Sequence, residues 1–114
     1  MNDKRFFAFL EDRKQAVLAE IQALSAEGRN DEANILKAKS NVYDIGRSMF
    51  QAADKLTKGN AEELFPVMFG NVTGTWRASL EQAKANGDER KILVEEAKIS
   101  AVDEIKAEFD AYIG

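Results

Sequence analysis

The chain has 114 residues, a net charge of −4 and a sequence pI near 4.9, and 45% of its residues are hydrophobic. This length fits one domain, residues 1–114, with a core large enough to fold without disulfides or metals. There is no Cys and no His. Their absence removes thiol chemistry, the commonest transition-metal ligand and the usual general base near neutral pH. We therefore expect no catalytic activity, no metal and no cofactor.

The acidic charge also bears on the expected partners. Affinity for nucleic acid comes largely from clustered Lys and Arg that neutralise phosphates, and the sequence has no basic stripe. No run approaches the roughly twenty apolar residues of a membrane span, and the apolar run at 6–10 is too short for a signal peptide. We expect a cytoplasmic protein without a nucleic-acid or membrane partner.

Apolar residues spaced by three, four or seven positions predict helices over residues 3–27 and 31–57. Gly28 lies between them and is a typical C-terminal stop. The apolar face of the first helix carries Phe6, Leu10, Val17, Ile21 and Leu24. The face of the second carries Ile35, Val42, Met49 and Leu56, with Ile45, Gly46, Phe50 and Ala53 between them.

The segment at 64–76, LFPVMFGNVTGTW, has no charged residue in a chain that is 32% charged. Pro66 lacks an N–H and is best tolerated at the first position of a helix, so we expect the third helix over residues 66–85. Asn60 and Glu63 have the spacing of a capping box, and residues 61–64 would form a separate turn or a kinked lead-in to the third helix. The predicted core stripe of the third helix is Phe65, Met68, Phe69, Val72 and Trp76.

A fourth helix is expected over residues 88–113, after the stop at Gly87. Four helices joined by short turns predict an all-α fold, an antiparallel up-down four-helix bundle. The alternative is a pair of long hairpins that bury their apolar faces by forming an intertwined dimer. When the two halves of the sequence are aligned 59 positions apart, several aligned positions are identical. This favours a duplicated helical hairpin, although two unrelated amphipathic hairpins would also align. The identities include Phe6 with Phe65, Lys39 with Lys98, Asp44 with Asp103 and Phe50 with Phe109.

The face of the third helix opposite its core stripe is uncharged and holds two glycines four positions apart. Glycine inside a helix costs about 1 kcal/mol relative to Ala, so we expect a compensating contact. One explanation is the close approach of another helix, for instance from a second subunit; the other is a bend at GNVTG. The predicted interface is Gly70, Thr73, Gly74 and Arg77.

A second candidate site is a pocket between the second and third helices, lined by aromatic residues with two polar contacts. Its predicted lining is Lys39, Tyr43, Phe65, Met68, Phe69 and Trp76. Four charged residues also project into or beside the apolar stripes: Arg13, Glu20, Lys39 and Lys98. These four either form a cluster that binds a small anion or extend their stems along apolar surface to reach solvent, helped by pairing with Glu20.

Pairs of carboxylates occur at 62–63, 95–96 and 103–104, and we interpret them as solvated helix faces. Two functions follow from these patterns. The first is a non-enzymatic interaction module that forms a homo-oligomer, such as a homodimer, or binds a partner protein. The second is a helical bundle that binds a small molecule in the aromatic pocket.

Overall fold

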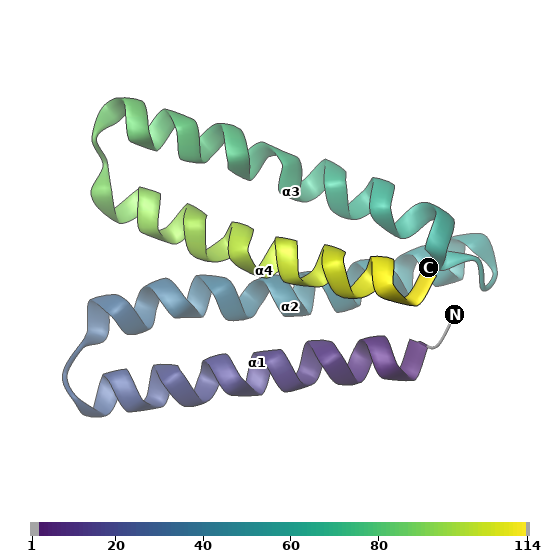
Figure 1. The fold of residues 1–114 in the computed structure, drawn as a ribbon, viewed down its shortest axis with the longest axis horizontal. Helices are drawn as coiled ribbons and strands as arrows, with labels where there is room; N and C mark the ends of the chain where they lie inside the picture. Colours follow the sequence, from purple (N-terminus) through teal and green to yellow (C-terminus); the bar gives the residue numbers. More distant parts are fainter. Residues whose placement is uncertain (1–2, 114) are drawn as a thin grey trace.

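A computed structural model describes residues 3–113, and all four expected helices are present (Figure 1). They are α1 (Asp3–Ala26), α2 (Asn30–Thr57), α3 (Ala61–Asn86) and α4 (Glu89–Ile113). Successive helices run antiparallel, and the molecule measures 45 × 33 × 22 Å. The predicted all-α four-helix bundle is confirmed.

Three glycine-containing turns separate the helices, at the positions that the sequence indicates. Gly28 and Gly87 have φ of +76° and +68°, in the left-handed region that glycine adopts without strain. The Gly87 N–H donates to the carbonyls of Ala83 and Lys84, which satisfies two acceptors at the end of α3. Between α2 and α3, Lys58 is also left-handed, with φ of 54°, and the positive φ of Gly59 follows it.

The inner helices of the bundle are α2 and α4. α4 packs against both α2 and α3, whereas α1 packs along α2, contacts α4 only sparsely and meets α3 where the Phe6 and Phe65 rings lie 5.7 Å apart. α2 and α4 run parallel because each is the second helix of a hairpin. Figure 1 shows α3 leaving α2 after the turn that joins them, so the tips of the two hairpins lie apart. The start of α1 and the end of α4 lie at the other end of the bundle, beside the α2–α3 turn.

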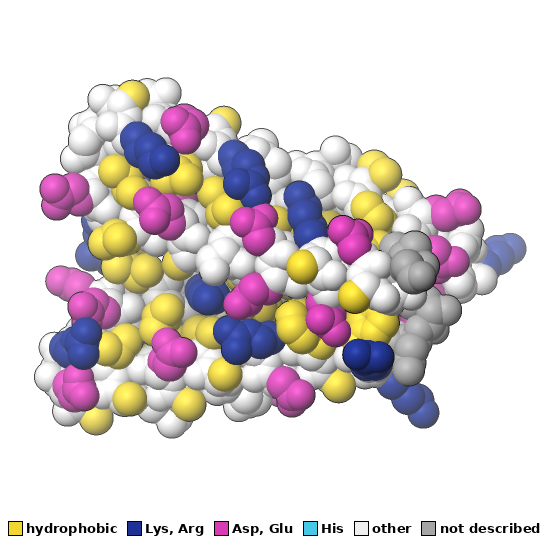
Figure 2. All heavy atoms as spheres, viewed as in Figure 1, with side chains coloured by type: hydrophobic (Ala, Val, Ile, Leu, Met, Phe, Trp, Pro, Cys, Tyr) yellow, Lys and Arg dark blue, Asp and Glu magenta, His cyan; other side chains and the backbone are white. Residues whose placement is uncertain are grey.

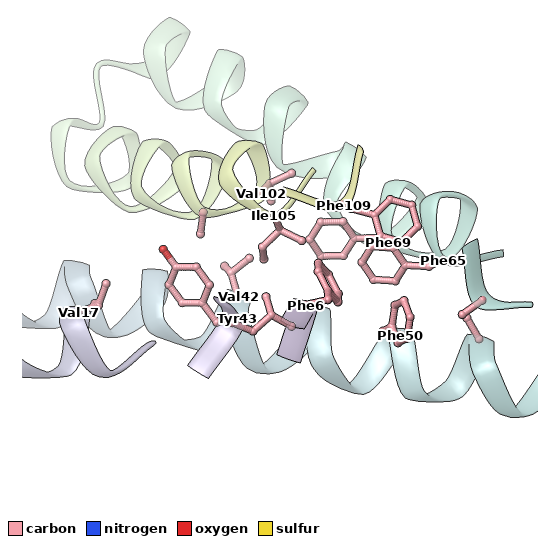
Figure 3. Packing of buried hydrophobic residues seen from close by; sticks show 14 of the residues in the cluster. Phe6, Val17, Val42, Tyr43, Phe50, Phe65, Phe69, Val102, Ile105 and Phe109 are labelled. Atoms are coloured by element: carbon pink, nitrogen blue, oxygen red, sulfur yellow. The ribbon is translucent and has the colours of Figure 1, made fainter. Parts of the chain in front are cut away.

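An aromatic cluster from all four helices fills this connected end (Figure 3). Its ring centroids lie 4.8 to 6.3 Å apart, within the range of favourable aromatic pairing. Each ring is at most 2% exposed, and burying a phenylalanine contributes about 1.5–3 kcal/mol. The cluster consists of Phe6, Phe50, Phe65, Phe69 and Phe109.

The two hairpins use equivalent residues in this core. Phe6 and Phe50 of the first hairpin pair at 5.2 Å, and Phe65 and Phe109, 59 positions later, pair at 4.8 Å. The seams between the hairpins are less alike, because α2 packs on α3 more closely than α1 packs on α4. The shared core pair favours the duplicated hairpin, which remains an interpretation.

The prediction for Pro66 is wrong, because α3 begins at Ala61 and the proline lies inside it. The missing N–H removes only one bond of the helical ladder, to the carbonyl of Glu62. Ala61 and Phe65 are 2% and 1% exposed, so their packing retains the helical turn before the proline. The capping box is also absent, because the Asn60 side chain makes no capping hydrogen bond. Instead, the backbone N–H of Asn60 donates to Thr57 Oγ1 at 3.0 Å.

Candidate functional site

The uncharged segment at 64–76 is helical throughout, so the bend that we considered at GNVTG does not occur. Phe65, Phe69 and Thr73 point into the bundle and are 1–3% exposed. Val67, at 56% exposed, lies on the opposite side. The segment therefore has an inner face that belongs to the core and an outer face that remains open.

The buried face of α3 is rotated about the helix axis relative to the predicted core stripe. Val72 is 41% exposed, whereas Thr73 is 3% exposed. Thr73 is tolerated there because its hydroxyl donates to the Phe69 carbonyl at 2.7 Å. One turn further, Arg77 forms an ion pair with Asp103 of α4 at 2.6 Å, so this side of α3 faces α4. Because α3 packs on α4 and diverges from α2, the face toward α4 is buried.

The predicted interface of Gly70, Thr73, Gly74 and Arg77 is thus not one exposed face. Thr73 is buried and Arg77 is paired within the chain, so both belong to the contact between α3 and α4. Gly70 is half-buried and Gly74 is exposed. The exposed, uncharged surface, which we call the outer face of α3, consists of Val67, Asn71, Gly74, Thr75 and Ala78.

No other helix of the chain compensates for the two glycines of α3. A Cβ atom built on Gly70 or Gly74 would have no atom of a neighbouring element within 4 Å. Gly46 of α2 differs, because its Cβ would lie 3.3 Å from Ile105 of α4, where the inner helices approach closely. The glycine at 46 thus has a packing role within the chain, and the two in α3 have none.

The six residues of the predicted pocket lie in four different places. Phe65 and Phe69 belong to the aromatic cluster and line a pocket of about 230 Å³ between α3 and α4. Tyr43 and Lys39 lie beside Glu104 of α4. Met68 is partly buried against the core. Trp76 contacts Lys98.

Glu104 is the centre of a polar cluster that joins α1, α2 and α4. Its Oε2 accepts a hydrogen bond from the Tyr43 hydroxyl, and its Oε1 lies 3.2 Å from the Arg13 guanidinium and 4.0 Å from Lys39 Nζ. Burial, reinforced by the Glu104 carboxylate, raises the pKa of Tyr43. Burial opposes the charged form of Arg13, but Glu104 and Tyr43 outweigh it and raise the pKa of the guanidinium. Tyr43 therefore acts as a neutral donor.

A second polar contact lies between α3 and α4. The Lys98 ammonium lies 4.3 Å from the centre of the Trp76 ring and 3.2 Å from Glu95 Oε1. Glu95 is only 6% exposed, and its Oε2 has no hydrogen-bond partner among the described residues. The interpretation of the 95–96 pair as solvated is thus wrong for Glu95, whose charge is balanced by Lys98.

Lys39 and Lys98 are both partly buried beside a carboxylate, whereas Glu20 is exposed and takes no part in these clusters. The signal for Lys39 and Lys98 was visible in the sequence as a charge within an apolar stripe. The partners Glu95 and Glu104 were missed because each occurs beside another acidic residue and resembles a solvated pair. Periodicity in one helix does not show which residue of another helix lies opposite.

Residues 3–113 contain no group of three or more acidic side chains placed to hold a metal ion. Within the same range, none of the helices combines the length and the apolar character that crossing a membrane requires. Comparisons with models of known protein families, with curated proteins and with solved structures gave no significant match.

Proposed function

We propose that this chain is a non-enzymatic interaction module that self-associates through the outer face of α3. The observation that carries the proposal is the unsupported glycine pair: Gly70 and Gly74 have open space where a Cβ would lie. Each costs about 1 kcal/mol in a helix interior, and no contact within residues 3–113 offsets that cost. A helix of another molecule could approach the backbone here.

A second copy of the same chain is the occupant that fits this face best. Val67 is 56% exposed and supplies apolar area beside the glycines. The face is uncharged over residues 64–76, so a strongly charged partner would find no counter-charge on it. Two identical uncharged faces related by a two-fold axis would match each other. A different partner protein is the alternative outcome of the experiment.

The experiment measures the mass of the full chain by sedimentation equilibrium over a range of concentrations. We expect a reversible dimer for the natural sequence and a monomer for Gly74→Glu, because the new carboxylates would face each other in an uncharged contact. The variant should fold, since Gly is a poorer helix former than Glu. Ala19→Glu on the exposed surface of α1 is the matched control and should dimerise normally.

A monomer at every concentration would overturn self-association. A dimer that persists in both Gly74→Glu and Val67→Glu would show that association uses another surface. Circular dichroism of each variant verifies that the helical content is unchanged, so loss of the dimer is not confused with unfolding.

A further inference from the structure

The seam between α1 and α4 is lined by charged side chains. These two helices contact each other sparsely, and Figure 2 shows Lys and Arg atoms beside Asp and Glu atoms along the line where they meet. Arg13, Lys39 and Glu104 are partly open to solvent there, with side chains 37%, 17% and 31% exposed. A small solute could reach all three without displacing a helix.

The ammonium of Lys39 lacks a hydrogen bond. Its closest acidic atom, Glu104 Oε1, is 4.0 Å away, beyond hydrogen-bond distance. No other acceptor within residues 3–113 takes its N–H groups, although most of its side chain is removed from solvent. The ammonium is not among the buried polar atoms of residues 3–113, so solvent reaches it, and an oxyanion at this point would replace water as a charge-assisted acceptor.

The Arg13 guanidinium also has unused donors. It carries five N–H groups, of which Nη2 donates to Glu104 Oε1 at 3.2 Å. Arg13 and Lys39 both approach this carboxylate oxygen, so their remaining donors lie near the same atom. An oxyanion placed there would accept bonds from both.

The charge of the cluster selects the class of anion. Arg13 and Lys39 carry two positive charges, against the single negative charge of Glu104. The neighbouring Lys14 is already balanced by Asp44 at 2.9 Å. The excess of one charge is neutralised by a monoanion, whereas a dianion would overcompensate it in a protein whose net charge is −4.

We propose that Arg13 and Lys39 form a binding site for a small carboxylate monoanion in the seam between α1 and α4. The carboxylate accepts from the Lys39 ammonium and the Arg13 guanidinium, and Tyr43 holds Glu104 in place by donating to its other oxygen. Charge-assisted bonds of this kind are among the stronger ones in proteins. The site is separate from the outer face of α3 and does not depend on self-association.

Titration with sodium acetate tests the site in the full chain, followed by NMR shifts of the Arg13 side-chain N–H and the Tyr43 ring at constant ionic strength. We expect saturable shifts with acetate, weaker binding of inorganic phosphate at a pH of about 8, where phosphate is mainly a dianion, and none with chloride. Lys39→Met should weaken acetate binding by roughly tenfold or more, the value of one charge-assisted bond. Glu104→Gln should tighten it, because the competing carboxylate becomes neutral.

Lys14→Met is the matched control, because it removes the same charge from a lysine that is already paired, and acetate affinity should be unchanged. Lys39→Met removes an ammonium that has no hydrogen bond, so it should fold, and Lys39→Gln is the second variant. Shifts that grow linearly without saturation would overturn the site. So would equal weakening by Lys14→Met and Lys39→Met, and phosphate binding tighter than acetate would overturn the monoanion assignment.

Discussion

Tyr43 of α2 donates a hydrogen bond to Glu104 of α4, 61 positions later in the chain. The bond crosses between the two hairpins and involves a tyrosine that is only 1% exposed. Arg13 brings α1 to the same carboxylate. This contact is therefore a polar link among three helices, with the buried Tyr43 on one side of Glu104 and the partly exposed Arg13 on the other.

Removal of the Tyr43 hydroxyl should destabilise the bundle. Tyr43→Phe keeps the ring but leaves Glu104 Oε2 without its donor, and we expect a loss of about 2 kcal/mol in the free energy of unfolding. Urea denaturation followed by circular dichroism measures the change. Tyr112→Phe is the control, because the buried Tyr112 hydroxyl has no hydrogen-bond partner of good geometry among residues 3–113 and its removal should be neutral or stabilising. Equal losses in both variants would contradict the role of the link.

The stability of the protein should fall at alkaline pH, and Tyr43 should contribute to the fall. Burial and Glu104 raise the pKa of Tyr43 in the folded state, so folding favours the protonated phenol. Its contribution is complete below the unfolded pKa of about 10 and is lost as the pH rises from there toward the folded pKa. Unfolding free energies measured from pH 8 upward should decline less steeply in Tyr43→Phe than in the natural sequence. Parallel curves would exclude this contribution.

Replacement of Pro66 should stabilise α3. The proline lies inside the helix and is exposed, so Pro66→Ala restores one backbone hydrogen bond without disturbing the core. We expect a gain of about 1–3 kcal/mol in the free energy of unfolding, measured by urea denaturation. A loss of stability would instead indicate that the proline sets the path by which Phe65 reaches the aromatic cluster.

Gly74→Ala should have opposite effects on folding and on association. The space around this glycine is open within the chain, so Ala should raise the stability of the monomer by up to about 1 kcal/mol through helix propensity. In a dimer that uses the outer face of α3, the added methyl group should hold the helices apart and weaken association. Thermal melting at low concentration and sedimentation at high concentration measure the two effects. Stabilisation without a change in association would argue against a glycine-mediated contact.

Ionic strength should affect dimerisation and acetate binding in opposite directions. Each copy carries a net charge of −4, so added salt screens the repulsion between copies and should strengthen dimerisation through an uncharged face. The same screening should weaken acetate binding at Arg13 and Lys39. Sedimentation and NMR titration between low salt and about 0.5 M sodium chloride measure both trends. A dimer that dissociates with salt would indicate an ionic interface.

Helix identity and most boundaries follow from the sequence because their causes are local. The left-handed turns at Gly28 and Gly87 depend on one residue each, Lys58 and Gly59 share this role between α2 and α3, and the apolar periods identify the core faces of α1 and α2. The start of α3 was mistaken because the burial of Ala61 and Phe65 outweighs the preference of Pro66 for a first turn. That burial depends on neighbouring helices, which a local rule does not include.

The functional residues were harder to predict for the same reason. Thr73 and Val72 exchange their expected roles because α3 packs on α4 and leaves α2, which the periodicity of α3 does not show. Lys39 was recognisable as a charge in an apolar stripe, but its partner Glu104 is 65 positions away. A single sequence indicates that such a charge requires compensation without identifying the residue that supplies it.

The uneven distribution of aromatic residues along the bundle has a consequence for hydrogen exchange. The rings of the aromatic cluster, such as Phe6 and Phe109, lie at the end where the α2–α3 turn, the start of α1 and the end of α4 meet, while the hairpin tips lie apart. Amide protons near the cluster should therefore exchange at the rate of global unfolding. Those toward Gly28 and Gly87 should exchange through smaller openings, so the two hairpins can separate at their tips while the aromatic end remains closed.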